Sequence, residues 1–289
     1  MMTDTGWMVK TIKSMGGKMM MPVKQMGKIF KNFTAGIVSG KDEVLTDGKS
    51  DGLKNKIISI LNSSQSDELI KTAYDLNNSA GNKILSKRQD FQFDESKLKK
   101  YHYRPLDYKY IYYEPEFLER HRFYLASSMC EQNLAISVSR LSANNIFTNV
   151  IVSDCLADYK LAESSRGSYF FPLYIYNHSG QQELLAESGK STNLLWNNLS
   201  YSQRKVSSEQ ILYYIYTILY SNIYRQKYQE FLKIDFPRIP FTKDYELFGK
   251  LSELGERLVQ LHLLKSPELP NPIVKYKGSG GNNVEKRGY

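Results

Sequence analysis

Residues 101–115 read YHYRPLDYKYIYYEP, and this stretch decides how the first half of the chain is interpreted. Six of its fifteen residues are tyrosine. Residues 107–113 alternate in the manner of a β-strand, in which successive side chains point to opposite faces. The face that we expect to be mostly buried carries Tyr108, Tyr110 and Tyr112. Lys109 points away from that face, and Pro105 holds the preceding Arg104 in an extended conformation.

The composition is that of a folded, basic protein. The chain has 289 residues, of which 41% are hydrophobic, enough for one large or two modest domains. Its formal net charge of +9 favours a polyanionic partner, either nucleic acid or an anionic membrane surface. No run approaches the roughly 18 apolar residues that a membrane span needs, so we expect no membrane partner. Two isolated cysteines, Cys130 and Cys155, suggest a reducing, cytoplasmic location.

Periodic patterns outside the tyrosine stretch predict strands and short helices before residue 177, and helices after residue 205. β-Branched, alternating residues predict strands within 134–140 and 149–158. Residues 168–176 predict an aromatic strand, in which Pro172 suggests an edge or a strand end. Helical spacing predicts helices at 53–61, 66–76, 119–129, 207–220, 224–233 and 242–264, with Ser66 as an N-cap and SSEQ as a capping box. Residues 77–83 are expected to be an Asn-rich loop.

These elements predict an α+β fold, with a mixed, largely antiparallel sheet region followed by a helical region. The main folded domain is predicted to cover residues 27–264. Its parts are a sheet-rich part at 27–176, a polar loop at 177–205 and a helical part at 206–264. A poorly structured basic segment at 1–26 precedes it, and a flexible tail at 265–289 follows it.

Several catalytic signatures are incomplete or missing. GIVSGKD and ESGKST both fail the G-x-x-x-x-G-K-[ST] pattern of a phosphate-binding loop. The four histidines have no metal-ligand spacing. Asp107, Glu114 and Glu116 could form an acid–base pair, but surface and turn carboxylates are far more common. The sequence therefore gives no positive sign of an enzyme.

Six motifs in a fixed order resemble a known family. They are FTAGIVSGKDEVL, YHYRPLDYKYIYYEP, ERHRFYLASSMCEQNLAISVSR, FTNVIVSDCLAD, SYFFPLYIY and EQILYYIYTILYSNIYRQKYQEFLKIDFPRIPF. Together they are similar to the C-terminal specificity region, or target-recognition domain, of Type ISP restriction–modification enzymes. The resemblance runs from about Met26 to the C-terminus. The chain departs from the usual motif at Leu106 and Lys109, where the family generally has Phe and Arg.

The resemblance implies a module that recognises double-stranded DNA and positions a methyltransferase and helicase–nuclease polypeptide on its target. The catalytic motifs of those parts are absent, so we expect binding without catalysis. S-adenosylmethionine, ATP and magnesium would belong to the missing parent domains, and no cofactor is expected here. Alternatively, the chain is a truncated or split-gene remnant that acts mainly as a protein-interaction module for a separate methyltransferase subunit, docking through the leucine stripe at 247–261.

Basic side chains within the matching motifs are the candidates for DNA contact, because Lys and Arg bind phosphates and guanine edges. They are Arg104, Lys109, Arg120, Arg122, Arg140 and Arg166. For each of them, a solvated charge or a carboxylate partner is the competing interpretation. The tyrosines at 213, 216 and 220 could stack on bases, but packing between helices is the stronger expectation.

Overall fold

The computed structural model describes residues 21, 23–141, 147–176, 189–195, 200–201 and 204–271, and within them the α+β prediction is confirmed. The helices are α2 (Asp42–Leu45), α3 (Ser50–Leu61), α4 (Asp67–Ala73), α5 (Ser79–Lys87), α6 (Phe123–Ala126), α7 (Ser208–Tyr220), α8 (Asn222–Lys227), α9 (Gln229–Ile234) and α10 (Tyr245–His262). The strands are β1 (Lys24–Gln25), β2 (Thr34–Ala35), β3 (Thr46–Asp47), β4 (Leu98–Arg104), β5 (Asp107–Tyr112), β6 (Ala135–Val138), β7 (Val150–Ser153), β8 (Leu156–Ala157), β9 (Tyr169–Pro172), β10 (Tyr174–Tyr176), β11 (Lys190–Thr192), β12 (Ser200–Tyr201), β13 (Arg204–Lys205) and β14 (Arg238–Ile239).

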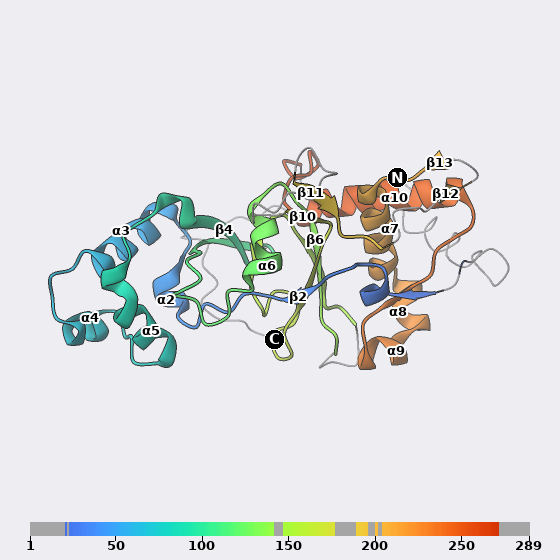
Figure 1. The fold of residues 1–289 in the computed structure, drawn as a ribbon. Helices are drawn as coiled ribbons and strands as arrows, with labels where there is room; N and C mark the ends of the chain where they lie inside the picture. The colour runs from blue at the N-terminus through green and yellow to red at the C-terminus, as the bar shows by residue number, and fades with distance from the viewer. Residues whose placement is uncertain are drawn as a thin grey trace.

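The antiparallel sheet β2-β9-β6-β7 separates two hydrophobic cores. In Figure 1 the helices α3 to α5 lie at one end of the molecule and α7 to α10 at the other, with this sheet between them. Neighbouring residues of one strand face opposite cores, as the period of two requires. Thus Phe171 and Ile136 pack with the helical end, whereas Phe170 and Ala135 pack with the N-terminal end.

The N-terminal core is built on the sheet β3-β5-β4-β8. β4 and β5 form a hairpin, and β8 adds to β4 in parallel. Leu53 and Ile57 of α3 belong to the same apolar cluster as Ile111 and Tyr112 of β5. Both faces of β5 are therefore covered at its C-terminal end, while its start at the hairpin turn projects into solvent.

The helical end is organised by the contact between α7 and α10. The predicted capping box is confirmed, because Ser207 and Gln210 cap each other at the start of α7. α10 approaches closely at Gly255, where an added Cβ would lie 2.0 Å from the carbonyl oxygen of Tyr213. The residues of the predicted α7 stripe are all buried: Ile211, Leu212, Ile215, Ile218 and Leu219.

The leucine stripe predicted for docking is not a free face. Leu251 is buried, and Leu247, Leu254, Leu258 and Leu261 are half-buried. The buried face of α10 instead carries Phe248, Leu251, Ser252, Gly255 and Val259. Small residues in that face allow the helices to approach, so the leucines are left at the edges of the contact.

The expectation that the tyrosine face is mostly buried was wrong for one of its three rings, Tyr110. Tyr112 is buried, but Tyr108 is half-buried and Tyr110 is 38% exposed. Burial changes along the strand rather than between its faces, because the packed helix α3 covers one end of β5 and not the hairpin turn.

Three local predictions also differ from the structure. Residues 79–87 form helix α5 rather than a loop, because the Asn78 side chain caps it by accepting the amide of Gly81 at 2.7 Å. The helix expected at 119–129 begins only at Phe123, after Arg122 in a left-handed conformation. Residues 190–192 pair with β10 as a strand. The expectations for residues 1–20, 177–188 and 272–289 lie outside the described ranges.

Candidate nucleic-acid interface

The segment 37–43 draws together parts of the chain that are distant in sequence. Ile37 pairs with Asp158, and the next residue, Val38, pairs with Arg120 on its other side. A cavity of about 310 Å³ opens beside this segment. Its lining beyond residues 37–43 is Asn78, Arg104, Asp158, Tyr159 and Lys160.

Arg104 and Lys109 share one aromatic ring. The guanidinium carbon of Arg104 lies 3.9 Å from the ring centre of Tyr103, and the ammonium of Lys109 lies 3.7 Å from the same centre. An aromatic face attracts cations through its quadrupole. Tyr103 therefore acts as a platform that fixes two of the predicted contact residues at the end of the hairpin.

Asp158 partly neutralises the charge of Arg104 on this platform. It accepts hydrogen bonds from Arg104 at 2.8 Å and from the hydroxyl of Tyr101 at 2.7 Å. Burial raises the pKa of the Asp158 carboxyl, against the opposing influence of these partners. Arg104 is thus held in place by an internal ion pair and still has 28% of its side chain exposed.

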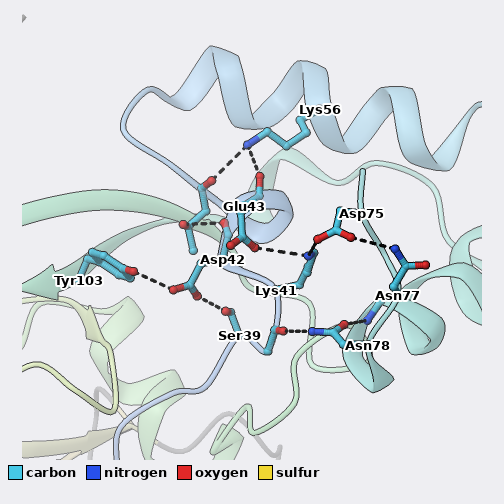
Figure 2. A network of polar contacts seen from close by, with 12 residues as sticks. Ser39, Lys41, Asp42, Glu43, Lys56, Asp75, Asn77, Asn78 and Tyr103 are labelled. Carbon is cyan, nitrogen blue, oxygen red and sulfur yellow. Dashed lines mark hydrogen bonds and ion pairs between the residues drawn. The ribbon is translucent and has the colours of Figure 1, made fainter. Parts of the chain in front are cut away.

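The ring of Tyr103 is itself fixed by Asp42. Figure 2 shows the Tyr103 hydroxyl donating to Asp42, at 2.8 Å, and Ser39 donating to the other oxygen of that carboxylate. Burial, together with the Asp42 carboxylate, raises the pKa of Tyr103 to about 12. The hydroxyl therefore stays protonated at neutral pH and remains a donor.

The segment 37–43 is also tied to the turn at 75–78, between α4 and α5. Lys41 is 8% exposed and its ammonium lies 2.9 Å from the Asp75 carboxylate and 3.7 Å from Glu43. The Asn78 side chain donates to the carbonyl of Gly40 at 2.9 Å, as Figure 2 shows from close by. Gly40 is left-handed, with φ of 77°, and a Cβ there would lie 2.6 Å from that of Ala80. The walls of the cavity are therefore rigidly connected.

Two further predicted cations border this region. Arg120 is 52% exposed and pairs loosely with its neighbour Glu119, at 3.7 Å. Arg166 is exposed, and its carbonyl accepts the hydroxyl of Tyr159, a residue that lines the cavity. Arg104, Lys109, Arg120 and Arg166 are thus each linked to the segment 37–43, through Asp158, Tyr103, Val38 and Tyr159 respectively.

The remaining two predicted cations lie in other environments. Arg140 forms an ion pair of 3.1 Å with Asp235 and lies 5.8 Å from the ring centre of Phe236, at the helical end. Arg122 has a left-handed backbone, and its Nε is buried without a hydrogen-bond partner among the described residues. The structure does not bring these two together with the other four.

Sequence reasoning missed three residues of the region. Lys160 is exposed at the cavity, while Lys41 and Asn78 form its walls. Nothing in the local sequence of Lys160 marks it, because the pairing of Ile37 with Asp158 places it there. Asn78 could have been found, since Asn before a short apolar pattern is a helix N-cap signal.

The hairpin carries a second aromatic–cation contact. The ammonium of Lys100 lies 4.2 Å from the ring centre of Tyr108 and 3.4 Å from the carboxylate of Asp154. His102 lies on the same face of β4 as Lys100, and its ring stacks on Tyr108 with centres 4.1 Å apart. Burial lowers the pKa of His102 to about 4, so its ring is neutral at pH 7.

Of the carboxylates considered for acid–base chemistry, Glu114 and Glu116 are each paired with a lysine, and Asp107 lies apart from both. Glu114 forms an ion pair of 3.4 Å with Lys97, and Glu116 forms one of 2.8 Å with Lys87. Asp107 is exposed and lies at the hairpin turn, at the other end of β5. Within the described ranges, no group of three His, Cys, Asp or Glu side chains could hold a metal ion, and no helix is long and apolar enough to cross a membrane.

The fold is that found in parts of several large, solved restriction enzymes. The chain aligns with the DrdV–DNA complex (TM-score 0.63, 24% identity, 81% of this chain and 23% of that one) and with LlaBIII, an ATP-dependent Type ISP restriction–modification enzyme bound to DNA (0.64, 23%, 81% and 16%). A nuclease-deletion mutant of the Type ISP enzyme LlaGI, in complex with a DNA substrate mimic, is also similar (0.59, 21%, 83% and 19%). The chain therefore spans less than a quarter of each of these proteins.

The family itself is shown by the sequence. The profile of the Type ISP C-terminal specificity domain matches residues 28–289, and the chain belongs to that family. No curated protein sequence matches the chain. The resemblance drawn from the six ordered motifs is thus confirmed, with a starting point two residues from the expected Met26.

Proposed function

We propose that this chain recognises double-stranded DNA as the specificity domain of a Type ISP restriction–modification enzyme and has no catalytic centre or cofactor of its own. Its role would be to position the methyltransferase and helicase–nuclease parts of such an enzyme on a target site. Membership of the specificity-domain family and the DNA in the three similar structures support this function.

The observation that carries the proposal is that four motif cations are each linked to the segment 37–43. Lys109 and Arg166 have no carboxylate partner among the described residues, and Arg104 and Arg120 keep exposed side-chain area beside their partners. Cations that a fold presents together in this way can neutralise neighbouring phosphates, which releases condensed counterions.

Fluorescence anisotropy with the full chain and duplex DNA tests the proposal. Binding should weaken steeply between about 50 and 200 mM salt. Lys109→Ala and Arg166→Ala should each reduce the slope of log affinity against log salt by about 1. Lys205→Ala is the matched control, since Lys205 is an exposed cation on β13 of the helical end. Equal slopes for all three variants, or no retention of duplex DNA at low salt, would contradict the proposal.

Sequence-specific recognition needs a second measurement. A random duplex pool bound by the wild-type chain should yield an enriched sequence, because base contacts add to the phosphate contacts. A pool that stays random while binding is salt-dependent would reduce the function to non-specific DNA binding.

A further inference from the structure

Two adjacent aromatic rings project into solvent at the start of α6. Tyr124 is 71% exposed, the largest value among the exposed large hydrophobic side chains of the described residues, and Phe123 is 47% exposed. The next two residues, Leu125 and Ala126, are buried. The helix is thus anchored by one side and presents an aromatic surface on the other. An exposed apolar patch of this kind, with suitable groups beside it, is typical of a binding surface.

The backbone that carries these rings is held firmly. Arg120 and Val38 exchange both backbone hydrogen bonds, at 3.0 and 3.1 Å. The hydroxyl of Tyr113 donates to the carbonyl of His121 at 2.8 Å, and the Phe123 amide donates to Nδ1 of His121 at 3.0 Å. The backbone that carries the rings is therefore already ordered before a ligand binds, so binding does not have to supply the free energy of ordering it.

The charges around the rings favour a nucleic acid over an apolar protein partner. Arg120 and His121 are both exposed and precede Phe123 by three and two residues. Through its pairing with Val38, this segment borders the cavity that Arg104 and Lys160 line. Aromatic faces beside cations match a base and its phosphate, whereas the cores of protein interfaces are depleted of charge.

We propose that Phe123 and Tyr124 stack against a base of DNA bound at the candidate interface, a base that is partly or wholly out of the duplex stack. This inference rests on the proposed DNA-recognition function and adds a contact type that the cations do not provide. Phosphate contacts position the duplex. An aromatic contact with an unstacked base makes the affinity depend on the free energy of unstacking that base step, which varies with DNA sequence.

Substitution of the rings separates this contact from the phosphate contacts. With the full chain and a duplex enriched from a random pool, Tyr124→Ala and Phe123→Ala should each weaken binding about ten-fold. The factor should be the same at low and at high salt, because stacking releases no counterions. Tyr124→Trp should retain the affinity, and Leu69→Ala, which removes a 59% exposed side chain from α4, should leave it unchanged. Unchanged thermal unfolding checks the fold of each variant.

A scan of single abasic sites through the same duplex identifies the stacked base. Removal of that base should weaken binding by the wild-type chain, and Tyr124→Ala should show no further loss at that position. The stacking inference is wrong if Tyr124→Ala and Phe123→Ala bind DNA as tightly as the wild-type chain. The DNA-recognition function still stands in that case, provided that the wild-type chain shows salt-dependent binding. If the wild-type chain retains no duplex DNA, both fall together.

Discussion

Helix α7 and hairpin β4–β5 are both rich in tyrosine, but Tyr214 and Tyr216 of the helix are fully buried, whereas Tyr103 and Tyr108 of the hairpin carry cations on partly exposed rings. In α7 the hydroxyl of Tyr214 donates to the carbonyl of Pro240, and that of Tyr220 donates to the carbonyl of Val150. In the hairpin, the rings of Tyr103 and Tyr108 face the charged ends of Lys or Arg side chains.

The difference follows from the residues between the tyrosines. In α7 they are Ile, Leu and Thr, so the helix is apolar on most of its surface and can be buried between other elements. In the hairpin they include Arg104 and Lys109, whose charges cannot be buried without partners. The same side chain thus serves as core in one region and as a platform for cations in the other.

Truncation of one tyrosine in each region should give the largest contrast. Tyr214 is fully buried and stacks on Phe241 and Phe248, with ring centres 5.1 and 4.9 Å apart. Tyr214→Ala should lower the free energy of unfolding by about 3–5 kcal/mol, as for other large-to-small core changes. Tyr110→Ala in the hairpin should cost less than about 1 kcal/mol. Urea denaturation measures both, and equal losses would contradict the contrast.

Acid should destabilise the hairpin through His102. Its pKa is about 4 in the folded protein and 6.5 when exposed, so protons bind preferentially to the unfolded chain. The stability that neutral His102 provides is complete above pH 6.5 and is lost as the pH falls from 6.5 towards 4, by roughly 3 kcal/mol. His102→Gln should remove that part of the pH dependence. Denaturation at several pH values tests this, and parallel profiles for the two proteins would refute it.

The two glycines of α10 should respond in opposite directions. A Cβ at Gly255 would meet the α7 backbone, so Gly255→Ala should destabilise the protein by about 1–3 kcal/mol through overpacking. A Cβ at Gly249 has nothing within 4 Å, and Gly249→Ala should stabilise it by up to about 1 kcal/mol through helix propensity. Thermal unfolding of the two variants isolates the α7–α10 contact. If both substitutions raise the melting temperature, the two helices can move apart enough to accept the added Cβ at Gly255.

Removal of a hairpin cation should have the smallest effect on stability. Lys109→Ala loses a contact with the Tyr103 ring that is worth about 0.5–1 kcal/mol at a partly exposed site. Its folding free energy should therefore stay within about 1 kcal/mol of the wild-type value, even though its DNA binding is expected to change. A larger loss in urea denaturation would mean that Lys109 supports the fold instead of a ligand surface.

Local patterns in the sequence were sufficient where an element is defined by its own residues. The capping box and apolar stripe of α7, and the presence of the strands β6, β7 and β9, were predicted correctly. The burial of β5 was not, because it depends on how far the separate helix α3 extends over the hairpin. The cavity could not be predicted, since Lys41, Asn78 and Lys160 meet through pairings between distant segments.

The sheet β2-β9-β6-β7 has an apolar face towards each core, and this has a consequence for how the protein melts. If either end came apart alone, one face of the sheet would be left in water while the other stayed packed. Phe170 and Phe171, adjacent in one strand, would then be forced into opposite states. The two halves should accordingly unfold together in a single cooperative transition, even though each has a core of its own.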